Sequence, residues 1–286
     1  MKSCVFIGGG NMASCIVSGL SNIHADEYRI TVCDPNQAKL DLLKEKYNVE
    51  ICLSNNKAVK HADLLILAVK PQSIRGVINK VKSFVKPSTI IISVAAGVKT
   101  SSIKSWLKKS NVIIRAMPNT PSAVLCGATG LYANPKTSEK TKNQVKEIFD
   151  AIGYSCWVDD EKDINAVIAL SGSSPAYFFK IFEIMQGIGQ ELGLEEKKAF
   201  ELLIQTFIGS SKMIRKMENT PAQLREQVTS PGGTTERALN VFNKGNLEST
   251  LREAMHKAYE RAEEMSEDFS VSVSYTHLTL PTIVRV

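Results

Sequence analysis

The chain has 286 residues, 43% of them hydrophobic and 22% charged, which is typical of a soluble globular protein of one or two domains. No apolar run reaches the roughly 18 residues of a membrane span, and no secretory signal precedes the first strand, so we expect a cytoplasmic protein without a membrane partner. The net charge of +6 comes from scattered lysines without interleaved aromatic residues, which favours small anionic ligands over nucleic acid. The six cysteines form no CxxC pair and have no histidine at metal-ligand spacing, so we expect reduced thiols and no metal.

Apolar strand patterns alternate with helical patterns over the first half of the chain. Helices are predicted at 11–20 and 34–47, and strands at 3–7, 29–33, 50–53, 63–69, 89–95, 111–116, 128–133 and 153–158. This alternation is typical of a parallel sheet covered by helices on both faces. The sequence therefore predicts an α/β domain with a doubly wound sheet over residues 1–160.

A glycine-rich turn, in the stretch VFIGGGNMA, joins the first strand to the first helix. Gly8, Gly10 and Ala13 fit the GxGxxA pattern of dinucleotide-binding turns. Gly8 permits the tight turn, Gly10 lets a pyrophosphate approach the backbone, and the helix start offers free N–H groups. A plain glycine turn is the alternative. The glycine turn directly follows the first predicted strand and begins the half of the chain in which strands and helices alternate. This position favours a Rossmann domain that binds a nucleotide.

The second predicted strand ends at an acidic residue, Asp34. An acid at this place hydrogen-bonds the adenosine ribose and favours NAD over NADP. Because DPN is also good turn chemistry, a simple turn cap is an equal alternative. No arginine follows to clasp a 2′-phosphate, and Asn36 and Lys39 are nearby substitutes. The choice between NADH and NADPH therefore stays open.

Strand patterns end near residue 160, and helical spacing follows at 163–172, 174–193, 195–218 and 246–268. The segment 177–192 is apolar on several sides, so it needs burial in a bundle core or at a subunit interface. We favour the interface and predict an all-helical dimerisation and substrate domain over residues 161–269. Residues 270–286 are β-branched and nearly free of acids. They form either a non-native end or a flexible tail, and carry no part of the functional argument.

Four further stretches combine strand or helix ends with polar residues: AVKPQ at 68–72, RAMPNTP at 115–121, SGSSPAY at 171–177 and SPGGTTERAL at 230–239. Each alone has an ordinary explanation. Proline often opens a helix, and threonine is a common N-cap. It is their combination and order that carry information.

The series FIGGGNMA, AVKP, AAGV, RAMPNTP, SGSSPAY and SPGGTT resembles the pyrroline-5-carboxylate reductase family over residues 3–268. The resemblance implies an N-terminal Rossmann domain and a C-terminal helical domain that interlocks with that of a second subunit. Homodimers, or larger rings built from them, are the implied partners. The implied reaction is hydride transfer from NADPH or NADH to the C=N carbon of 1-pyrroline-5-carboxylate, which gives L-proline in the last step of proline biosynthesis.

The same resemblance implies roles for individual residues. Those implied to bind the cofactor are Gly8, Gly10, Asn11 and Met12 at the pyrophosphate, Asp34 and Asn36 at the adenosine ribose, Asn56 on the adenine side, Ala68, Lys70 and Pro71 along the nucleotide, and Ala95, Gly97 and Asn119 towards the nicotinamide. Those implied to bind the substrate are Gly233, Thr234, Thr235 and Glu218, with Gln227 where the family often has an asparagine.

The implied substrate carries a carboxylate and an imine, and both chemistries fit the motif SPGGTT. Helix-start N–H groups suit the carboxylate, and Thr235, Glu218 or a water would supply the proton. We expect no Ser-His-Asp arrangement, since the four histidines fall outside every motif. A related hydroxyacid or imine reductase would want a lysine on the first long helix, where none precedes Lys180. A cofactor-binding scaffold without turnover would not need the intact SPGGTT.

Overall fold

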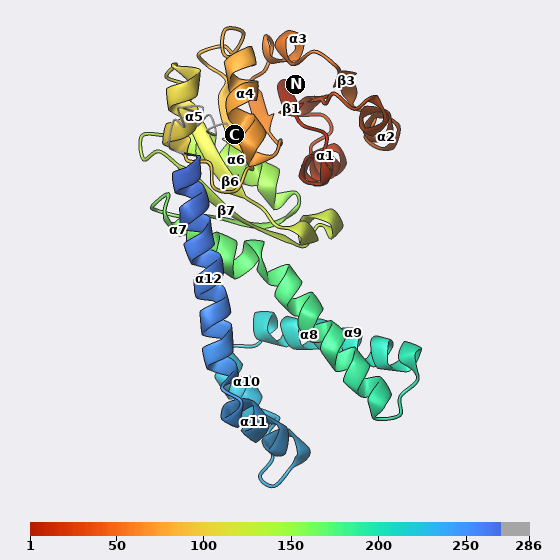
Figure 1. Ribbon diagram of the computed structural model, residues 1–286. Coiled ribbons are helices and arrows are strands. Elements are labelled where there is room, and N and C mark those ends of the chain that lie inside the picture. Colours follow the sequence, from red (N-terminus) through yellow and green to blue (C-terminus); the bar gives the residue numbers. More distant parts are fainter. Residues whose placement is uncertain (270–286) are drawn as a thin grey trace, which may run out of the picture.

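An eight-stranded sheet forms the centre of the N-terminal half of the computed structural model, which describes residues 1–269 (Figure 1). The predicted tail, 270–286, lies outside the described residues. The strands run in the spatial order β3-β2-β1-β4-β5-β6-β7-β8. Their bounds are β1 (Lys2–Ile7), β2 (Tyr28–Cys33), β3 (Glu50–Cys52), β4 (Leu64–Leu67), β5 (Ile90–Ser93), β6 (Ile113–Met117), β7 (Gly127–Ala133) and β8 (Gly153–Trp157). All eight predicted strands are present, and the first six follow the Rossmann order.

The prediction of a parallel sheet is wrong at one strand, β7, which pairs antiparallel with β6. Only residues 118–126, including the short helix η1 (Thr120–Val124), connect the two strands. A parallel crossover needs about a dozen residues or more, so this connection can only reverse the chain. Helix α6 (Glu139–Asp150) then provides a full crossover, and β8 is parallel to β7.

Helices cover both faces of the sheet, as a doubly wound fold requires. They are α1 (Asn11–Ile23), α2 (Gln37–Tyr47), α3 (Asn55–Val59), α4 (Pro71–Val81), α5 (Thr100–Leu107) and α6. Side chains of β1 alternate between two apolar cores: Cys4 and Phe6 pack with α1, α2 and α6, whereas Val5 and Ile7 pack with α3, α4 and α5. The period of two along the strand therefore builds both cores at once.

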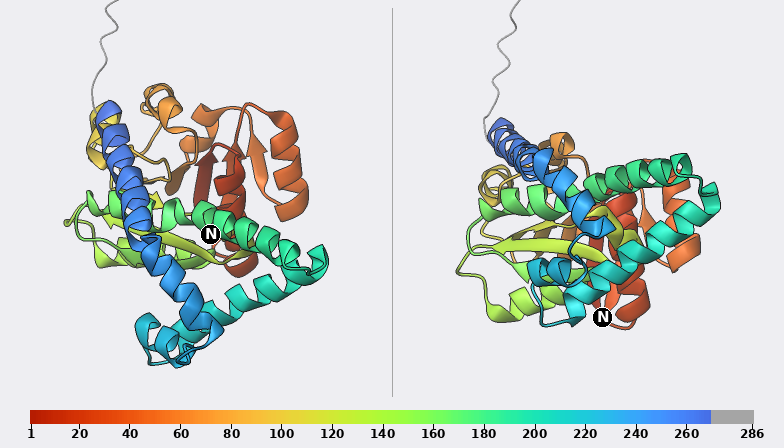
Figure 2. Two further views of the ribbon diagram at one scale, coloured as in Figure 1. Left: turned by 60° about the horizontal axis from the view of Figure 1, so that its bottom comes forward. Right: turned by 90° about the horizontal axis from the view of Figure 1, so that it is seen from below.

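The second half of the chain is helical, as predicted. It contains α7 (Asp163–Val167), the π-helical turn η2 (Ile168–Gly172), α8 (Ser174–Glu191), α9 (Glu196–Lys216), α10 (Pro221–Gln227), α11 (Thr234–Lys244) and α12 (Leu247–Asp268). Helices α8 and α9 project from the sheet domain as a pair, and α12 returns from α11 to the sheet domain near α5 (Figures 1 and 2). Near its end, Met265 packs so close to Gly97 that a Cβ there would lie 2.8 Å from the Cβ of Met265.

One side of the α8–α9 pair packs on itself, and the other side is open. Phe182 meets Phe200 and Phe207 edge to face, with ring centroids 5.5 Å and 5.6 Å away. Phe178 and Phe179, by contrast, are 57% and 68% exposed. Exposed apolar area of this kind marks an interaction surface, in agreement with the expected interface over 177–192.

Candidate active site

The glycine turn after β1 has the geometry that its sequence demands. Gly8 has φ +104°, a conformation that other residues rarely adopt. A Cβ at Gly8 would lie 2.7 Å from the carbonyl carbon of Ala68, at the end of β4. Gly10 is different: it is the N-cap of α1, has no side-chain cap, and a Cβ there would meet nothing within 4 Å. The turn therefore packs tightly at Gly8 and leaves open space at Gly10.

The carboxylate of Asp34 ties the end of β2 to this turn. Its Oδ2 accepts a hydrogen bond from the Gly9 N–H at 2.8 Å, and its Oδ1 accepts one from the Asn36 N–H at 2.9 Å. Asn36 in turn caps α2, since its Oδ1 accepts from the Lys39 N–H at 3.2 Å. Asp34 thus has the turn-capping role that was one of its two alternatives. Each carboxylate oxygen keeps a lone pair free for a ribose hydroxyl.

The other residues expected at the cofactor lie at or beyond the carboxyl ends of the parallel strands. Because these ends meet at one edge of the sheet, the turn after β1, the end of β2 and the segments after β4 and β5 form one rim. Asn11 and Met12 begin α1, Asn56 lies in α3, Ala68, Lys70 and Pro71 join β4 to α4, and Ala95 and Gly97 follow β5. Gly97, with φ +75°, faces α12.

Asn119 holds two motifs of the sequence together. Its buried amide donates from Nδ2 to the Ser171 carbonyl at 2.9 Å, and its Oδ1 accepts from the Ala128 N–H at 2.8 Å. RAMPNTP is thereby joined to SGSSPAY and to the start of β7. The side chain thus has a structural role in this link, and its contact with a nicotinamide stays a prediction.

SPGGTT opens a helix, as its sequence predicts. Gly233 is the N-cap of α11, and it has no side-chain cap. The N–H of Gly232 donates to Oε2 of Glu236 at 2.8 Å, and that of Gly233 to the Ser230 carbonyl at 3.0 Å. The next three N–H groups, those of Thr234, Thr235 and Glu236, have no acceptor within the helix, whereas the N–H of Arg237 donates to the Gly233 carbonyl at 3.3 Å. Both threonines are exposed, so this helix start is accessible to a ligand.

Glu218 and Gln227 lie beside this region on the preceding segment, and both are exposed. Glu218 lies between α9 and α10, and Gln227 is the last residue of α10. Within one chain the fold does not join the two predicted halves of the site. Helices α10 and α11 lie at the end of α12 that is remote from the sheet domain (Figure 1).

One polar cluster at the junction of the two domains was not predicted. Arg115, in β6, is only 2% exposed, and its Nη1 lies 3.7 Å from Oε1 of Glu161. Glu161 also accepts from the N–H and the hydroxyl of Thr100, at 2.6 Å and 2.8 Å, and so caps α5. Burial lowers the pKa of Arg115, and the charge of Glu161 opposes that shift. The partners are 46 residues apart in sequence (161 − 115), which no local pattern reveals.

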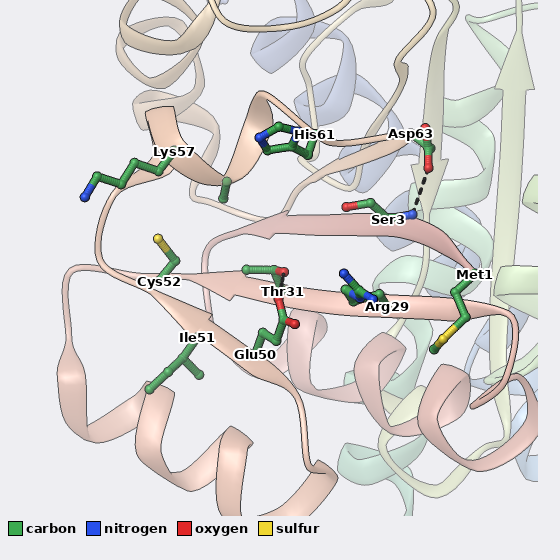
Figure 3. Close-up of a pocket in the computed structure, with 11 residues that line it drawn as sticks. Met1, Ser3, Arg29, Thr31, Glu50, Ile51, Cys52, Lys57, His61 and Asp63 are labelled. Carbon is green, nitrogen blue, oxygen red and sulfur yellow. Dashed lines mark hydrogen bonds between the residues drawn. The ribbon is translucent and has the colours of Figure 1, made fainter.

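A cavity of about 490 Å³ at the opposite end of the strands does not belong to this site (Figure 3). It is lined by Ser3, Arg29 and Asp63, at the amino ends of β1, β2 and β4. Part of its polar lining is internally bonded: the Ser3 N–H donates to Asp63 at 2.8 Å, and Thr31 donates to Glu50 at 3.1 Å.

Residues 1–269 contain neither a membrane-spanning helix nor a metal-binding cluster. None of their helices has the length and apolar character needed to cross a membrane. In the same range, no group of three His, Cys, Asp or Glu side chains is arranged to hold a metal ion.

The sheet order, the glycine turn and the helical second half define a two-domain, dinucleotide-binding protein of the Rossmann type. Comparison with known families agrees. Residues 3–97 match the model described as NADP oxidoreductase, coenzyme F420-dependent, and residues 161–265 match that of pyrroline-5-carboxylate reductase dimerisation. The chain belongs to the pyrroline-5-carboxylate reductase family.

Full-length relatives establish this membership. A pyrroline-5-carboxylate reductase of Pseudomonas aeruginosa is 38% identical, over 92% of this chain and 96% of its own length. A solved pyrroline-5-carboxylate reductase of Coxiella burnetii is 43% identical with a TM-score of 0.86, and the match covers 92% of this chain and 98% of that one. The Plasmodium falciparum pyrroline carboxylate reductase, solved with NADP bound, is 28% identical with a TM-score of 0.82, covering 93% and 98%.

Proposed function

We propose that this chain reduces 1-pyrroline-5-carboxylate to L-proline, with NAD(P)H as the hydride donor. The observation that carries the proposal is that two helices, α1 and α11, begin at a glycine without a side-chain cap, in a chain of this family. One, at Gly10, follows a dinucleotide-type turn, and the other, at Gly233, suits a small carboxylate. The Plasmodium relative, solved with NADP bound, supports the same class of cofactor.

The cofactor turn fits a dinucleotide on its own geometry. Gly8 packs against β4 and fixes the direction of the chain, while Gly10 leaves room beside the free N–H groups of α1. These N–H groups, with the positive end of the helix dipole, bind the pyrophosphate. Asp34 holds the turn through Gly9 and offers its remaining lone pairs to the adenosine ribose.

The substrate carboxylate binds at the start of α11. The N–H groups of Thr234 and Thr235 are directed out of the helix start, and the glycines before them add no side-chain bulk. The hydroxyl of Thr235 adds a further hydrogen bond. Glu218 and Gln227 stand on the neighbouring segment, where Glu218 stabilises the positive charge of a protonated imine.

The reaction needs one hydride and one proton. NAD(P)H, when bound, supplies the hydride for the imine carbon. The proton reaches the ring nitrogen from solvent through Thr235 or Glu218, so that nitrogen becomes the amine of L-proline. Since protonation of the imine already makes its carbon electrophilic, the chain's main task is to orient the ring. This explains why no histidine is needed.

We infer that the complete site contains two subunits of a homodimer. Within one chain, α11 and the cofactor rim lie at opposite ends of the long helix α12 (Figure 1). The exposed apolar face of α8 and α9 lies within the segment that matches the dimerisation family. A second copy that covers this face brings its own α10 and α11 towards the cofactor rim of the first.

The reaction is tested by following the oxidation of NADPH and of NADH, side by side, with 1-pyrroline-5-carboxylate. Turnover that depends on the substrate, with L-proline as the product, supports the proposal. Tight cofactor binding without turnover contradicts it and points to a different imine or to a non-catalytic binder.

The shared site is tested by mixing two impaired variants, Gly10→Ala and Thr235→Ala, under conditions that exchange subunits. If the site joins the Gly10 turn of one subunit to the Thr235 segment of its partner, each mixed dimer contains one unmodified site, and activity returns. If both elements act within one chain, every site carries one substitution and mixing restores nothing. The Thr235→Ala protein mixed with itself is the control.

A further inference from the structure

Two cysteines lie side by side at the ends of the neighbouring parallel strands β2 and β3. Cys33 is the last residue of β2 and Cys52 the last residue of β3, and the register of the two strands pairs them directly. Both lie on the same face of the sheet, because Cys33 belongs to the apolar core that α3, α4 and α5 cover and Cys52 packs against that core. The two positions are 19 residues apart in the sequence (52 − 33), so no CxxC spacing reveals the pair.

The backbone at this pair suits a disulfide. Neighbouring strands lie about 4.7–4.9 Å apart, and disulfide-bonded cysteines have Cα atoms about 4.4–6.8 Å apart. Strand β3 has three residues and, within the described residues, pairs with β2 alone, so its backbone can adjust to bring the sulfur atoms together. Cys4, on the other neighbour of β2, points into the opposite core. Cys33 can therefore bond to Cys52 but not to Cys4.

The two thiols differ in reactivity. Cys33 is fully buried, and burial, with a smaller contribution from the Cys52 thiol, raises the pKa of Cys33 to about 12. Cys52 is half-buried and lines the cavity of about 490 Å³ shown in Figure 3, so small solutes reach it from solvent. Because oxidants attack accessible thiolates, Cys52 reacts first and Cys33 second.

Metal binding and simple packing explain the pair less well. Two thiols supply half of the four ligands of a structural zinc site. No group of three His, Cys, Asp or Glu side chains in residues 1–269 is arranged for a metal. Packing in the core requires only a small apolar side chain at each position, and it gives no reason for two sulfur atoms at one register position.

We propose that Cys33 and Cys52 form a reversible disulfide when a peroxide reaches Cys52. Hydrogen peroxide transfers one oxygen to the Cys52 sulfur, which becomes a sulfenic acid, and the other oxygen leaves as water. The Cys33 sulfur then attacks the Cys52 sulfur, and the displaced hydroxyl leaves with the Cys33 proton as a second water. Two thiols and one peroxide thus give one disulfide and two waters. A dithiol reverses the reaction by thiol–disulfide exchange.

The bond adjoins the contacts that hold the glycine turn. The Cys33 carbonyl accepts a hydrogen bond from the Gly8 N–H at 2.7 Å, and the next residue, Asp34, accepts one from the Gly9 N–H at 2.8 Å. Since β3 and β1 lie on opposite sides of β2, a bond that draws Cys33 towards β3 moves both acceptors away from the turn. Oxidation therefore lowers the affinity for NADPH. This consequence rests on the proposed function, whereas formation of the bond does not.

The bond is tested by mass spectrometry on the full-length protein. The protein is treated with hydrogen peroxide, its remaining thiols are blocked with N-ethylmaleimide, and it is digested with trypsin without a reductant. We expect peptides 30–39 and 47–57 as one linked species that dithiothreitol separates. Cys52→Ser should abolish the linked species, and Cys126→Ser, which removes an exposed cysteine outside the pair, should retain it. Absence of the linked species from the unmodified protein would overturn the proposal.

The effect on the cofactor is tested by fluorescence titration with NADPH before and after oxidation. We expect oxidation to weaken binding about tenfold, the equivalent of one lost hydrogen bond, and dithiothreitol to restore it. Cys52→Ser should bind NADPH equally before and after the treatment. Unchanged affinity of the disulfide-linked protein would overturn the link to the cofactor turn. A reduced protein that fails to bind NADPH would contradict the proposed function, while the linked peptides would still decide whether the disulfide forms.

Discussion

Gly8 and Gly10 lie two residues apart in one turn, yet the structure predicts opposite consequences for an added methyl group. At Gly8 the methyl requires a left-handed backbone, with φ +104°, and would lie 2.7 Å from the carbonyl carbon of Ala68. At Gly10 the same methyl meets nothing within 4 Å. The first substitution should therefore affect the fold, and the second should affect only a ligand that approaches the turn.

The clash at Gly8 has little room to relax, because both backbones are held. The Gly8 N–H donates to the Cys33 carbonyl at 2.7 Å, and the Ala68 N–H donates to the Ile7 carbonyl at 2.9 Å. Backbone strain of about 1–3 kcal/mol adds to overpacking of about 1–3 kcal/mol. Gly8→Ala should thus lower the free energy of unfolding by about 2–6 kcal/mol. Gly10→Ala should change it by at most about 1 kcal/mol, the usual effect of alanine at an N-cap.

Urea unfolding measures the free energy of unfolding of each variant, and fluorescence titration measures its affinity for NADPH. We expect Gly10→Ala to retain its stability and to lose cofactor affinity, since the methyl occupies the space next to the helix N–H groups. Undiminished NADPH affinity in Gly10→Ala would refute the assigned position of the pyrophosphate. An unchanged unfolding free energy in Gly8→Ala would refute the steric reasoning.

Four other substitutions test separate parts of the molecule. Thr235→Ala should lower kcat/KM for the imine by about 1–3 kcal/mol in transition-state binding while NADPH affinity stays constant; an equal loss of both would exclude a substrate role. Asp34→Ser should raise the ratio of kcat/KM with NADPH to that with NADH, whereas a constant ratio would leave Asp34 only its turn bonds. Glu161→Gln should lower the unfolding free energy by about 1–3 kcal/mol, because the buried guanidinium of Arg115 loses its charged partner; Glu139→Gln, which removes a 78% exposed carboxylate, should cost below about 0.5 kcal/mol and is the control. Phe179→Asp should give folded monomers in sedimentation velocity, and a persistent dimer would exclude the α8 face from the interface.

The sequence was most informative where structure follows from neighbouring residues. The strands were predictable from short apolar runs, and the helix starts at Pro71 and Thr234 from the proline and glycines next to them. The short helix α10 was missed, although Thr220 and Gln223 form a capping box that the sequence TPAQ contains. The direction of β7 follows from the short connection between β6 and β7, residues 118–126. A strand pattern alone gives the position of a strand but not its direction.

Long-range contacts were the part that the sequence could not supply. Arg115 stood in a recognised motif, but its role depends on Glu161 and Thr100, which the fold brings to it from other elements. Asn119 was expected at the nicotinamide from the resemblance, and the structure shows that its side chain also bonds Ser171 and Ala128. In both cases a polar residue in a motif stabilises the junction between segments, and the pattern alone does not separate that role from ligand binding.

The proposed shared site makes both assembly and catalysis depend on the exposed apolar face of α8 and α9. Helix α12 has 22 residues and so extends about 33 Å; α11 lies at one of its ends and the sheet domain at the other (Figure 1). An isologous dimer repeats each contact twice, so a phenylalanine such as Phe179, worth about 1.5–3 kcal/mol when buried, contributes twice that amount to the pair. An isolated chain keeps a complete cofactor turn and an exposed α11 start, but no arrangement in which the two meet. Under the proposed shared site, cofactor binding is a property of the single chain, whereas hydride transfer requires the dimer.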